Sequence, residues 1–395
     1  MSLSVRPKAY TLPSYSLTGD LIGFLRCGLQ YRYTRIGNLP PSQPVQLWFG
    51  EFIHGVLDEA FRRYQDTVRN GNPVLPPWPD AELDDIRALI KARLAARGLH
   101  AWNPDMEELG DQRARAAIQE LGPYLFPLIH RSEVRLYGAR LLPPIQSQYQ
   151  FRLADRYEMV GIVDVVTHIA FNDPTLRDNP LIRLIRAQCP NLPHDGTYEL
   201  IVDYKGMRRP ANLGLVRGSY WDQYAWQIQT YAELRRKQAD ALKVVAGVLI
   251  YVNELYPSKS DMRDLKREVQ GNLTDVPPAA GSEAEQLLRS WSSHQDAPVL
   301  SLEYRLARAL RVIPVDGKSV QEALANFDDV VRRIETCRGK ELTGTPILQA
   351  WERNASDEST CVICDSRTFC PDYQGQYARR HGEMRPRLPS IRKQS

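Results

Sequence analysis

The order of strand and helix patterns along the chain predicts an α/β fold, in which a sheet core follows an N-terminal helical region. The segments "YEMVGIVDVVTHIA" (157–170) and "TYELIVDYK" (197–205) are apolar, β-branched runs typical of buried strands. The segment "SYWDQYAWQIQTYAELRRKQ" (219–238) has the pattern of a long helix, and "LKVVAGVLIYVNE" (242–254) predicts another buried strand. Strands that alternate with a helix in this way favour a sheet covered by helices.

Two helices are expected ahead of the sheet. "SYSLTGDLIGFLRCGLQYRY" (14–33) begins with a serine cap and repeats apolar residues at helical spacing. "LWFGEFIHGVLDEAFRRY" (47–64) carries an apolar face, and the polar-rich region 81–131 is predicted to be helical as well.

The remaining elements have weaker patterns. A moderately alternating strand is expected at 147–155, and further helices are expected at 320–338 and 346–353. The proline-rich connection 171–196 is expected to loop out and return. A strand hidden in it would break the pairing of the strands at 157–170 and 197–205.

Bulk properties exclude some classes of protein. The chain has 395 residues and a net charge of +4, which says little about partners. The first ten residues lack the apolar core of a signal peptide, and the longest apolar run (244–252) is too short to span a bilayer. A cytoplasmic protein with no membrane contact is therefore expected. Six cysteines in such a protein indicate metal ligands, buried thiols or catalytic groups rather than a disulfide framework.

Charged residues occur within the first of the two predicted strands and at the end of the second. Asp164 lies inside an apolar run, where a carboxylate is costly unless it is paired or binds a cation. Asp203 and Lys205 point to one face because side chains alternate along a strand. Two converging carboxylates can hold Mg²⁺ or Mn²⁺, and Lys205 can then orient a water or offset charge on a phosphate. The alternatives are an Asp164 that caps a turn and a Lys205 that only forms a salt bridge with Asp203.

Four motifs together resemble the PD-(D/E)XK nuclease superfamily, and within it the RecB-like exonucleases. They are G-x-x-D at 161–164, (D/E)-x-K at 203–205, Q-x-x-x-Y at 227–231 and a histidine on an early helix, His54. The resemblance implies a restriction-endonuclease-like mixed sheet core flanked by helices. It also implies that His54, Asp164, Asp203 and the backbone carbonyl of Tyr204 bind Mg²⁺ or Mn²⁺.

The same resemblance assigns further roles. Lys205 would be catalytic with the two acids, and Gln227 and Tyr231 would organise the site or contact DNA. Glu133 is the best match to an assisting acid that precedes the first core strand in the family. Outside the resemblance, a histidine such as His54 is more often buried and satisfied than a metal ligand, and Gln227 could equally be a helix-surface residue.

The cysteine spacing indicates a second metal centre. "CVICDSRTFC" places Cys361, Cys364 and Cys370 so that a tight turn can direct their sulfurs at one point, with Cys27 as the leading fourth ligand. The RecB-like group that includes AddB-type helicase–nucleases and CRISPR-associated exonucleases shows this arrangement, which implies a structural 4Fe-4S cluster. Four-cysteine zinc is the alternative. Cys189 and Cys337 fit no pattern and are expected to be ordinary thiols.

These features predict a metal-dependent DNA nuclease, acting as an exonuclease on single-stranded or linear ends. Arg208 and Arg209 are expected to contact the DNA backbone, although charge runs often lie on solvated faces. The sequence has no Walker-type motif, so unwinding would require a helicase partner. The alternatives are a subunit that cuts only within a repair, CRISPR-adaptation or antiphage defence complex, a non-cleaving DNA-binding scaffold, and an RNA target.

The expected organisation follows chain order. It comprises an N-terminal helical region with Cys27 and His54 (1–135), a PD-(D/E)XK nuclease core (136–260), a C-terminal helical region with the clustered cysteines (261–378) and a basic, disordered tail (379–395).

Overall fold

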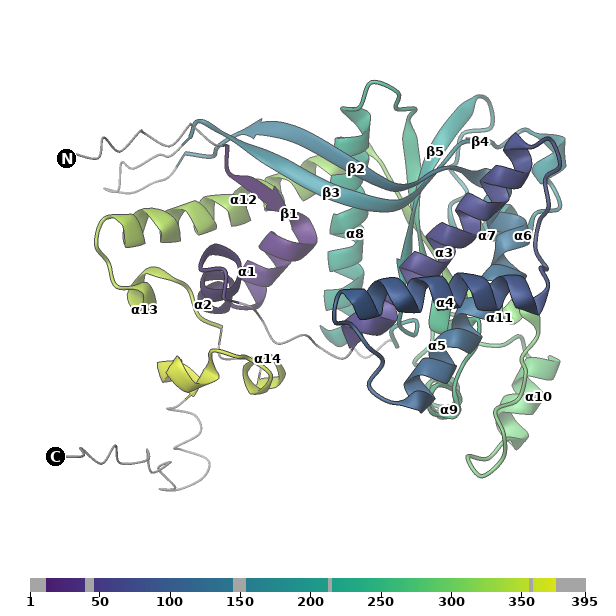
Figure 1. Cartoon of the computed structure of the whole chain (residues 1–395). Coiled ribbons are helices and arrows are strands. Elements are labelled where there is room, and N and C mark those ends of the chain that lie inside the picture. The colour runs from purple at the N-terminus through teal and green to yellow at the C-terminus, as the bar shows by residue number, and fades with distance from the viewer. Residues whose placement is uncertain (1–11, 40–45, 145–153, 212–214, 355–357, 374–395) are drawn as a thin grey trace. The chain divides into compact units, whose positions relative to one another are not determined.

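The computed structural model describes residues 12–39, 46–144, 154–211, 215–354 and 358–373 (Figure 1). The expected basic tail lies outside these residues, as does most of the strand expected at 147–155. In the described residues no helix has the length and apolar character needed to cross a membrane.

A seven-stranded mixed sheet forms the centre of the fold. Its strands are β1 (Ser14–Ser16), β2 (Ile129–Leu141), β3 (Arg156–Thr167), β4 (Ile169–Ala170), β5 (Thr197–Lys205), β6 (Val244–Tyr251) and β7 (Leu310–Pro314). The order is β1-β3-β5-β6-β7, with β2 paired to β3 and β4 paired to β5. β5 and β6 are parallel, whereas β3 is antiparallel to β5 and β7 to β6. The α/β, restriction-endonuclease-like mixed sheet flanked by helices is thus confirmed.

The chain forms two compact units. One comprises the described residues of Met1–Ser42, Ala139–Met159 and Ala325–Ser395, and the other comprises those of Gln43–Gly138 and Val160–Leu324. Both units are built from non-contiguous segments, whereas the predicted boundaries at 135 and 260 follow chain order.

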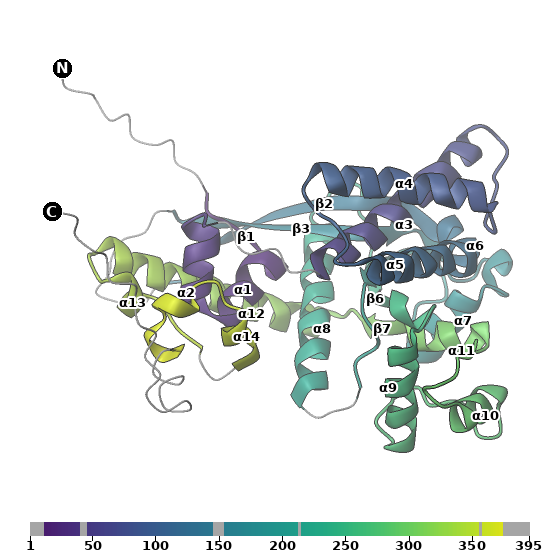
Figure 2. The same cartoon turned by 60° about the horizontal axis from the view of Figure 1, so that its bottom comes forward.

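The larger unit contains most of the helices. They are α3 (Gln46–Arg69), α4 (Asp80–Ala96), α5 (Pro104–Ala116), α6 (Gly122–Leu125), α7 (Pro180–Gln188), α8 (Leu215–Arg236), α9 (Lys259–Gln270), α10 (Glu283–Ser290) and α11 (Leu302–Ala309). α3 and α4 lie side by side (Figure 2). They pack closely, since a Cβ atom at Gly55 would lie 3.0 Å from Ile90. The helical region expected at 81–131 is confirmed as far as η4 (Phe126–Leu128), after which β2 begins.

Both faces of the central strands are covered. Every residue of β6 is buried, as expected for a strand with helices on both sides. α8 lies against one face, where a Cβ atom at Gly247 would come within 2.3 Å of Ile228. α6 and α7 cover the other face, where Leu125 and Ile185 line a small apolar cavity with Val202 and Val248. Alternation along β5 therefore directs Asp203 and Lys205 toward α8.

The smaller unit joins segments from both ends of the chain. It holds β1, η1 (Leu17–Leu21), α1 (Ile22–Arg26), α2 (Gly28–Tyr31), η2 (Arg32–Ile36), α13 (Ile347–Ala350), α14 (Glu358–Val362), η7 (Arg367–Phe369) and α12 (Gly317–Leu342) from Ala325 onward. The rings of Phe24, Tyr31 and Trp351 pack together, and the Trp351 indole N–H donates to Glu341 at 2.6 Å. The helices expected at 320–338 and 346–353 are confirmed in outline. The segment expected as one helix at 14–33 instead begins with β1, has no serine side-chain cap, and is interrupted at the extended Cys27.

The connection 171–196 folds differently from the expected loop. It contains the turn η5 (Pro174–Leu176) and then α7, which begins with Pro180 behind the Asn179 side-chain cap. Leu181, Ile182 and Ile185 form its buried face. Residues 171–196 contain no strand, so β3 and β5 pair directly. This direct pairing was the condition for Asp164 to lie beside Asp203.

Candidate active site

The two predicted acids meet across the β3–β5 pair. Val165 pairs with Val202, so the next position in this antiparallel register places Asp164 opposite Asp203. Asp164 Oδ2 accepts a hydrogen bond of 2.7 Å from the backbone N–H of Tyr204. Both carboxyl groups are buried, where an uncompensated charge is costly. The neighbouring groups must therefore provide the compensation.

His54 provides part of the charge compensation for the buried Asp164. The middle of α3 directs the imidazole so that Nδ1 lies 3.2 Å from Asp164 Oδ1 and Nε2 lies 3.0 Å from the Tyr204 carbonyl oxygen. Both partners are acceptors, so the ring satisfies both when each nitrogen carries a proton. Burial favours the neutral ring, but the nearby carboxylates, Asp164 foremost, outweigh it and raise the pKa of His54 to about 9.

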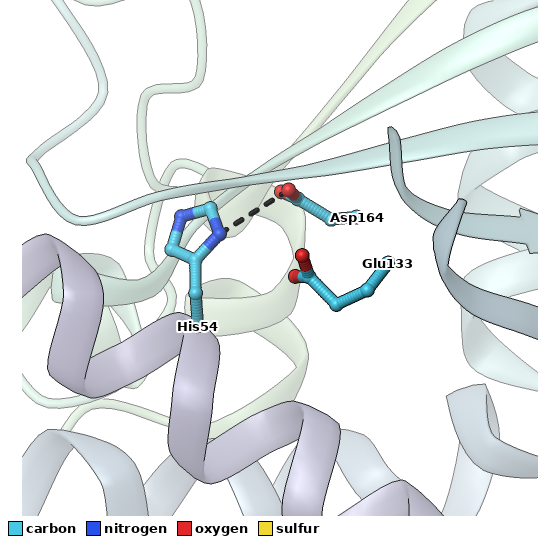
Figure 3. A group of neighbouring side chains, drawn as sticks. All are labelled: His54, Glu133 and Asp164. Atoms are coloured by element: carbon cyan, nitrogen blue, oxygen red, sulfur yellow. Dashed lines mark ion pairs between the residues drawn. The ribbon is translucent and has the colours of Figure 1, made fainter. Parts of the chain in front are cut away.

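Glu133 is the third member of this group. One oxygen of Glu133, one of Asp164 and one nitrogen of His54 lie within 4.8 Å of one another, and Figure 3 shows the three side chains converging. Glu133 lies inside β2, not ahead of a strand, and has a φ of +50°. A backbone conformation this rare for a non-glycine residue is typical of a position where the chain re-aims a side chain. Glu133 is exposed at the surface, yet the protein around its carboxyl group removes part of its hydration, and this effect, followed by the charge of Asp164, raises its pKa.

These residues form a donor set that fits a divalent cation. His54, Glu133, Asp164 and the Tyr204 carbonyl, here called the histidine–acid cluster, offer one imidazole nitrogen among oxygen donors. Mn²⁺ and Mg²⁺ prefer oxygen ligands, and Mn²⁺ tolerates an imidazole. Glu133, expected from the resemblance only as an assisting acid, is part of the cluster.

Asp203 and Lys205 belong to a second set of contacts beside the first. Lys205 Nζ forms an ion pair with Asp203 Oδ2 and donates to Gln227 Oε1 at 3.0 Å. The Gln227 amide nitrogen donates back to Asp203 Oδ1, also at 3.0 Å. These three residues, here called the lysine network, hold one another's side chains in place. Burial raises the pKa of Asp203 despite the adjacent ammonium group. The predicted ligand Asp203 thus makes its closest contacts with Lys205 and Gln227.

Residues of the G-x-x-D and Q-x-x-x-Y motifs are in contact. Tyr231 is buried, and its hydroxyl oxygen accepts a hydrogen bond of 3.4 Å from Gln227. A Cβ atom on Gly161 would lie 2.6 Å from the Tyr231 ring, closer than side-chain carbons pack. Glycine at 161 therefore lets the Tyr231 ring approach β3, and Tyr231 in turn supports Gln227 in the lysine network.

One neighbour of Lys205 was not identified from the sequence. Lys205 Nζ lies 4.2 Å from the ring centroid of Tyr224, within the range of a cation–π contact. Tyr224 precedes Gln227 by three positions, so both lie on one face of α8. That spacing was available in the sequence.

Arg208 and Arg209, predicted to contact the DNA backbone, are engaged inside the protein. Arg209 is 4% exposed, and its Nε and Nη2 atoms form two hydrogen bonds with Asp275, of 2.9 and 2.6 Å. Arg208 Nη1 lies 3.0 Å from Glu268 Oε1. Both guanidinium charges are therefore offset by acids, which does not favour phosphate contacts at these positions.

The four clustered cysteines also come together, in the smaller unit. Cys27 lies between α1 and α2, and Cys361, Cys364 and Cys370 lie in and after α14. All four line one pocket. The Leu29 N–H donates to the Glu352 carbonyl at 2.8 Å, which fastens the Cys27 turn to the chain leading to Cys361. Burial, followed by the nearby Cys27 and Cys370, raises the pKa of the Cys364 thiol.

Four sulfur donors around one pocket suit zinc or an iron–sulfur cluster. Cys189 and Cys337 are buried and do not line this pocket.

Comparison with known proteins supports the nuclease interpretation over part of the chain. The sequence model of the PD-(D/E)XK nuclease superfamily matches residues 19–178. This segment includes His54, Glu133 and Asp164, and it ends before Asp203. No curated protein matches the sequence.

Proposed function

We propose that this chain, which carries a PD-(D/E)XK nuclease superfamily domain over residues 19–178, is a metal-dependent exonuclease that hydrolyses DNA from single-stranded or linear ends. The observation that supports it most is the adjacency of the histidine–acid cluster and the lysine network. Tyr204 joins them, since its carbonyl contacts His54 and its chain neighbours are Asp203 and Lys205. Metal ligands and a cation for the phosphate would therefore act at the same point.

The roles of the residues follow from their contacts. His54, Glu133, Asp164 and the Tyr204 carbonyl would hold Mg²⁺ or Mn²⁺, and Asp203 would complete the ligand set by turning from Lys205. The bound ion supplies positive charge against the phosphate and lowers the pKa of water. Lys205 would orient the attacking water and offset charge on the phosphoryl oxygens. Gln227 would hold the ammonium group in place through its 3.0 Å hydrogen bond.

An assay on DNA of different topology tests this proposal. Wild-type protein would be incubated with end-labelled single strands, linear duplex and closed circular DNA, with Mn²⁺, Mg²⁺ or EDTA. We expect degradation of linear DNA that requires the metal, while circles stay intact. Circles cut as fast as linear DNA would contradict end dependence, and no cleavage under any condition would contradict nuclease activity.

We also propose that Cys27, Cys361, Cys364 and Cys370 hold a structural 4Fe-4S cluster. The shared pocket supports a four-sulfur centre, and the resemblance of the cysteine arrangement to that of the RecB-like group favours iron over zinc. Protein purified without oxygen should be brown, with broad visible absorbance and about four iron atoms per chain. Colourless protein with one zinc ion would contradict the iron assignment.

A further inference from the structure

One face of α8 carries a stripe of side chains that leads from the buried lysine network to solvent. Tyr231, Gln227, Tyr224 and Tyr220 are separated by three or four positions and therefore share this face. Tyr231 and Gln227 are buried, Tyr224 is half-buried, and Tyr220 is 40% exposed. Tyr220 is the outermost member of this stripe.

The aromatic rings of the stripe are in contact with each other and with Lys205. The ring centroids of Tyr220 and Tyr224 lie 6.1 Å apart, and the ring planes differ by 28°. The Tyr224 ring in turn contacts Lys205 Nζ, and its hydroxyl donates to Met207 Sδ at 3.1 Å. Tyr224 is thus held from two sides, and Tyr220 packs on it one ring further from the lysine.

An exposed ring, linked through Tyr224 to the lysine proposed to face a phosphate, matches the chemistry of a nucleotide. Each nucleobase has an aromatic face, and stacking on a tyrosine is favourable for all four bases. Base faces inside a duplex are covered by neighbouring pairs, so only an unpaired or terminal base can offer one. The ring therefore selects for single strands and not for sequence.

We propose that Tyr220 is a substrate-binding residue that stacks on an unpaired nucleobase next to the phosphate held by Lys205. The substrate class is then a single-stranded end, and a duplex end must fray before it enters. This inference rests on the proposed nuclease function and specifies its substrate.

A binding experiment tests the stacking without requiring cleavage. The probe is a single-stranded DNA oligonucleotide with 2-aminopurine near one end, in Ca²⁺, and its fluorescence falls when the base stacks. Wild-type protein should quench the probe. Tyr220→Ala should lose this quenching and bind roughly five- to 150-fold more weakly, the range expected for one lost base stack. Tyr220→Phe should retain both, and Tyr220→Leu should behave as Tyr220→Ala.

An abasic oligonucleotide separates stacking from a structural role of Tyr220. With no base to stack, wild type and Tyr220→Ala should bind it equally. Tyr137→Ala is the matched control, because Tyr137 is also exposed and its carbonyl accepts from Gln238, beyond the opposite end of α8. Equal losses on intact and abasic strands, unchanged binding by Tyr220→Ala, or a wild type that does not bind single strands would each overturn the inference. Failure of cleavage alone would count against the nuclease proposal and not against stacking.

Discussion

The proton on His54 links metal binding at the histidine–acid cluster to pH. The imidazole must lose this proton to bind a cation, and the carboxylates around it raise its pKa to about 9. Below that pH the proton competes with the metal, so Mn²⁺ affinity should rise with pH, by up to about tenfold per unit, and level off above pH 9. About one proton should be released per ion at pH 7.

Calorimetric titration with Mn²⁺ in two buffers of different ionisation enthalpy measures this proton release. His54→Gln should bind the ion more weakly and lose most of the pH dependence between pH 7 and 9. The same proton release by His54→Gln and wild type would contradict the role of His54.

Gly161 is the position beside the lysine network at which the geometry leaves no room for a side chain. Gly161→Ala should displace the Tyr231 ring, cost about 1–3 kcal/mol of unfolding free energy and lower the nuclease rate. Gly50→Ala is the control, because no atom lies within 4 Å of its added Cβ and alanine stabilises a helix by about 1 kcal/mol. Denaturant unfolding of both variants provides the measurement. A Gly161→Ala protein as stable and as active as wild type would refute the contact.

Single residues also show how far sequence reasoning reaches. Alternation along a strand, which is a local rule, predicted that Asp203 and Lys205 share a face. That Asp164 meets them was implied by the motif resemblance, since the two strands are far apart in the sequence. The burial of Arg209 could not be predicted, because its partner Asp275 lies 66 positions away. A charged run has the same pattern whether it faces solvent or an internal acid.

At the scale of elements, a buried ion pair fastens α8 to β5. Arg235 and Glu199 are almost completely buried, and two hydrogen bonds of 2.8 and 2.7 Å join them. Arg235→Ala would leave the Glu199 carboxylate without its cation, at a cost of about 3–5 kcal/mol. Arg236→Ala removes an exposed guanidinium from the buried Glu233, which keeps Lys237 as a second cation, so the loss should be about 1 kcal/mol or less.

Chemical denaturation of Arg235→Ala and Arg236→Ala compares the two positions on neighbouring residues of one helix. Equal losses of unfolding free energy would show that the Arg235–Glu199 pair does not anchor α8.

The elements that sequence patterns did not predict have identifiable causes. β2 reads "IHRSEVRLYGARL", and most of its residues are exposed or half-buried, so no clean apolar alternation marks it. β7 has only five residues. α7, by contrast, had a readable signal in Asn179 and Pro180, a side-chain cap followed by proline at the first helical position.

At the scale of the whole molecule, the cysteine pocket joins the two ends of the described chain within the smaller unit. Cys361→Ala should therefore lower the melting temperature as well as the iron content, because a lost metal–thiolate bond frees the C-terminal segment. Cys189→Ala is the control for iron, since Cys189 does not line the pocket and should leave the iron content unchanged. Calorimetry and iron analysis of both variants provide the measurement. An unchanged melting temperature for Cys361→Ala would count against a structural role for the cluster.

The most direct test of the central claim is the rate of DNA degradation by Lys205→Ala in Mn²⁺. The control is Lys318→Ala, whose side chain is 87% exposed on α12. Both proteins would be shown by circular dichroism to be folded. Loss of the ammonium group should lower kcat by at least about a hundredfold, the effect of removing one preorganised charge, while Lys318→Ala matches wild type. Degradation by Lys205→Ala at the wild-type rate would contradict the assignment of the active site.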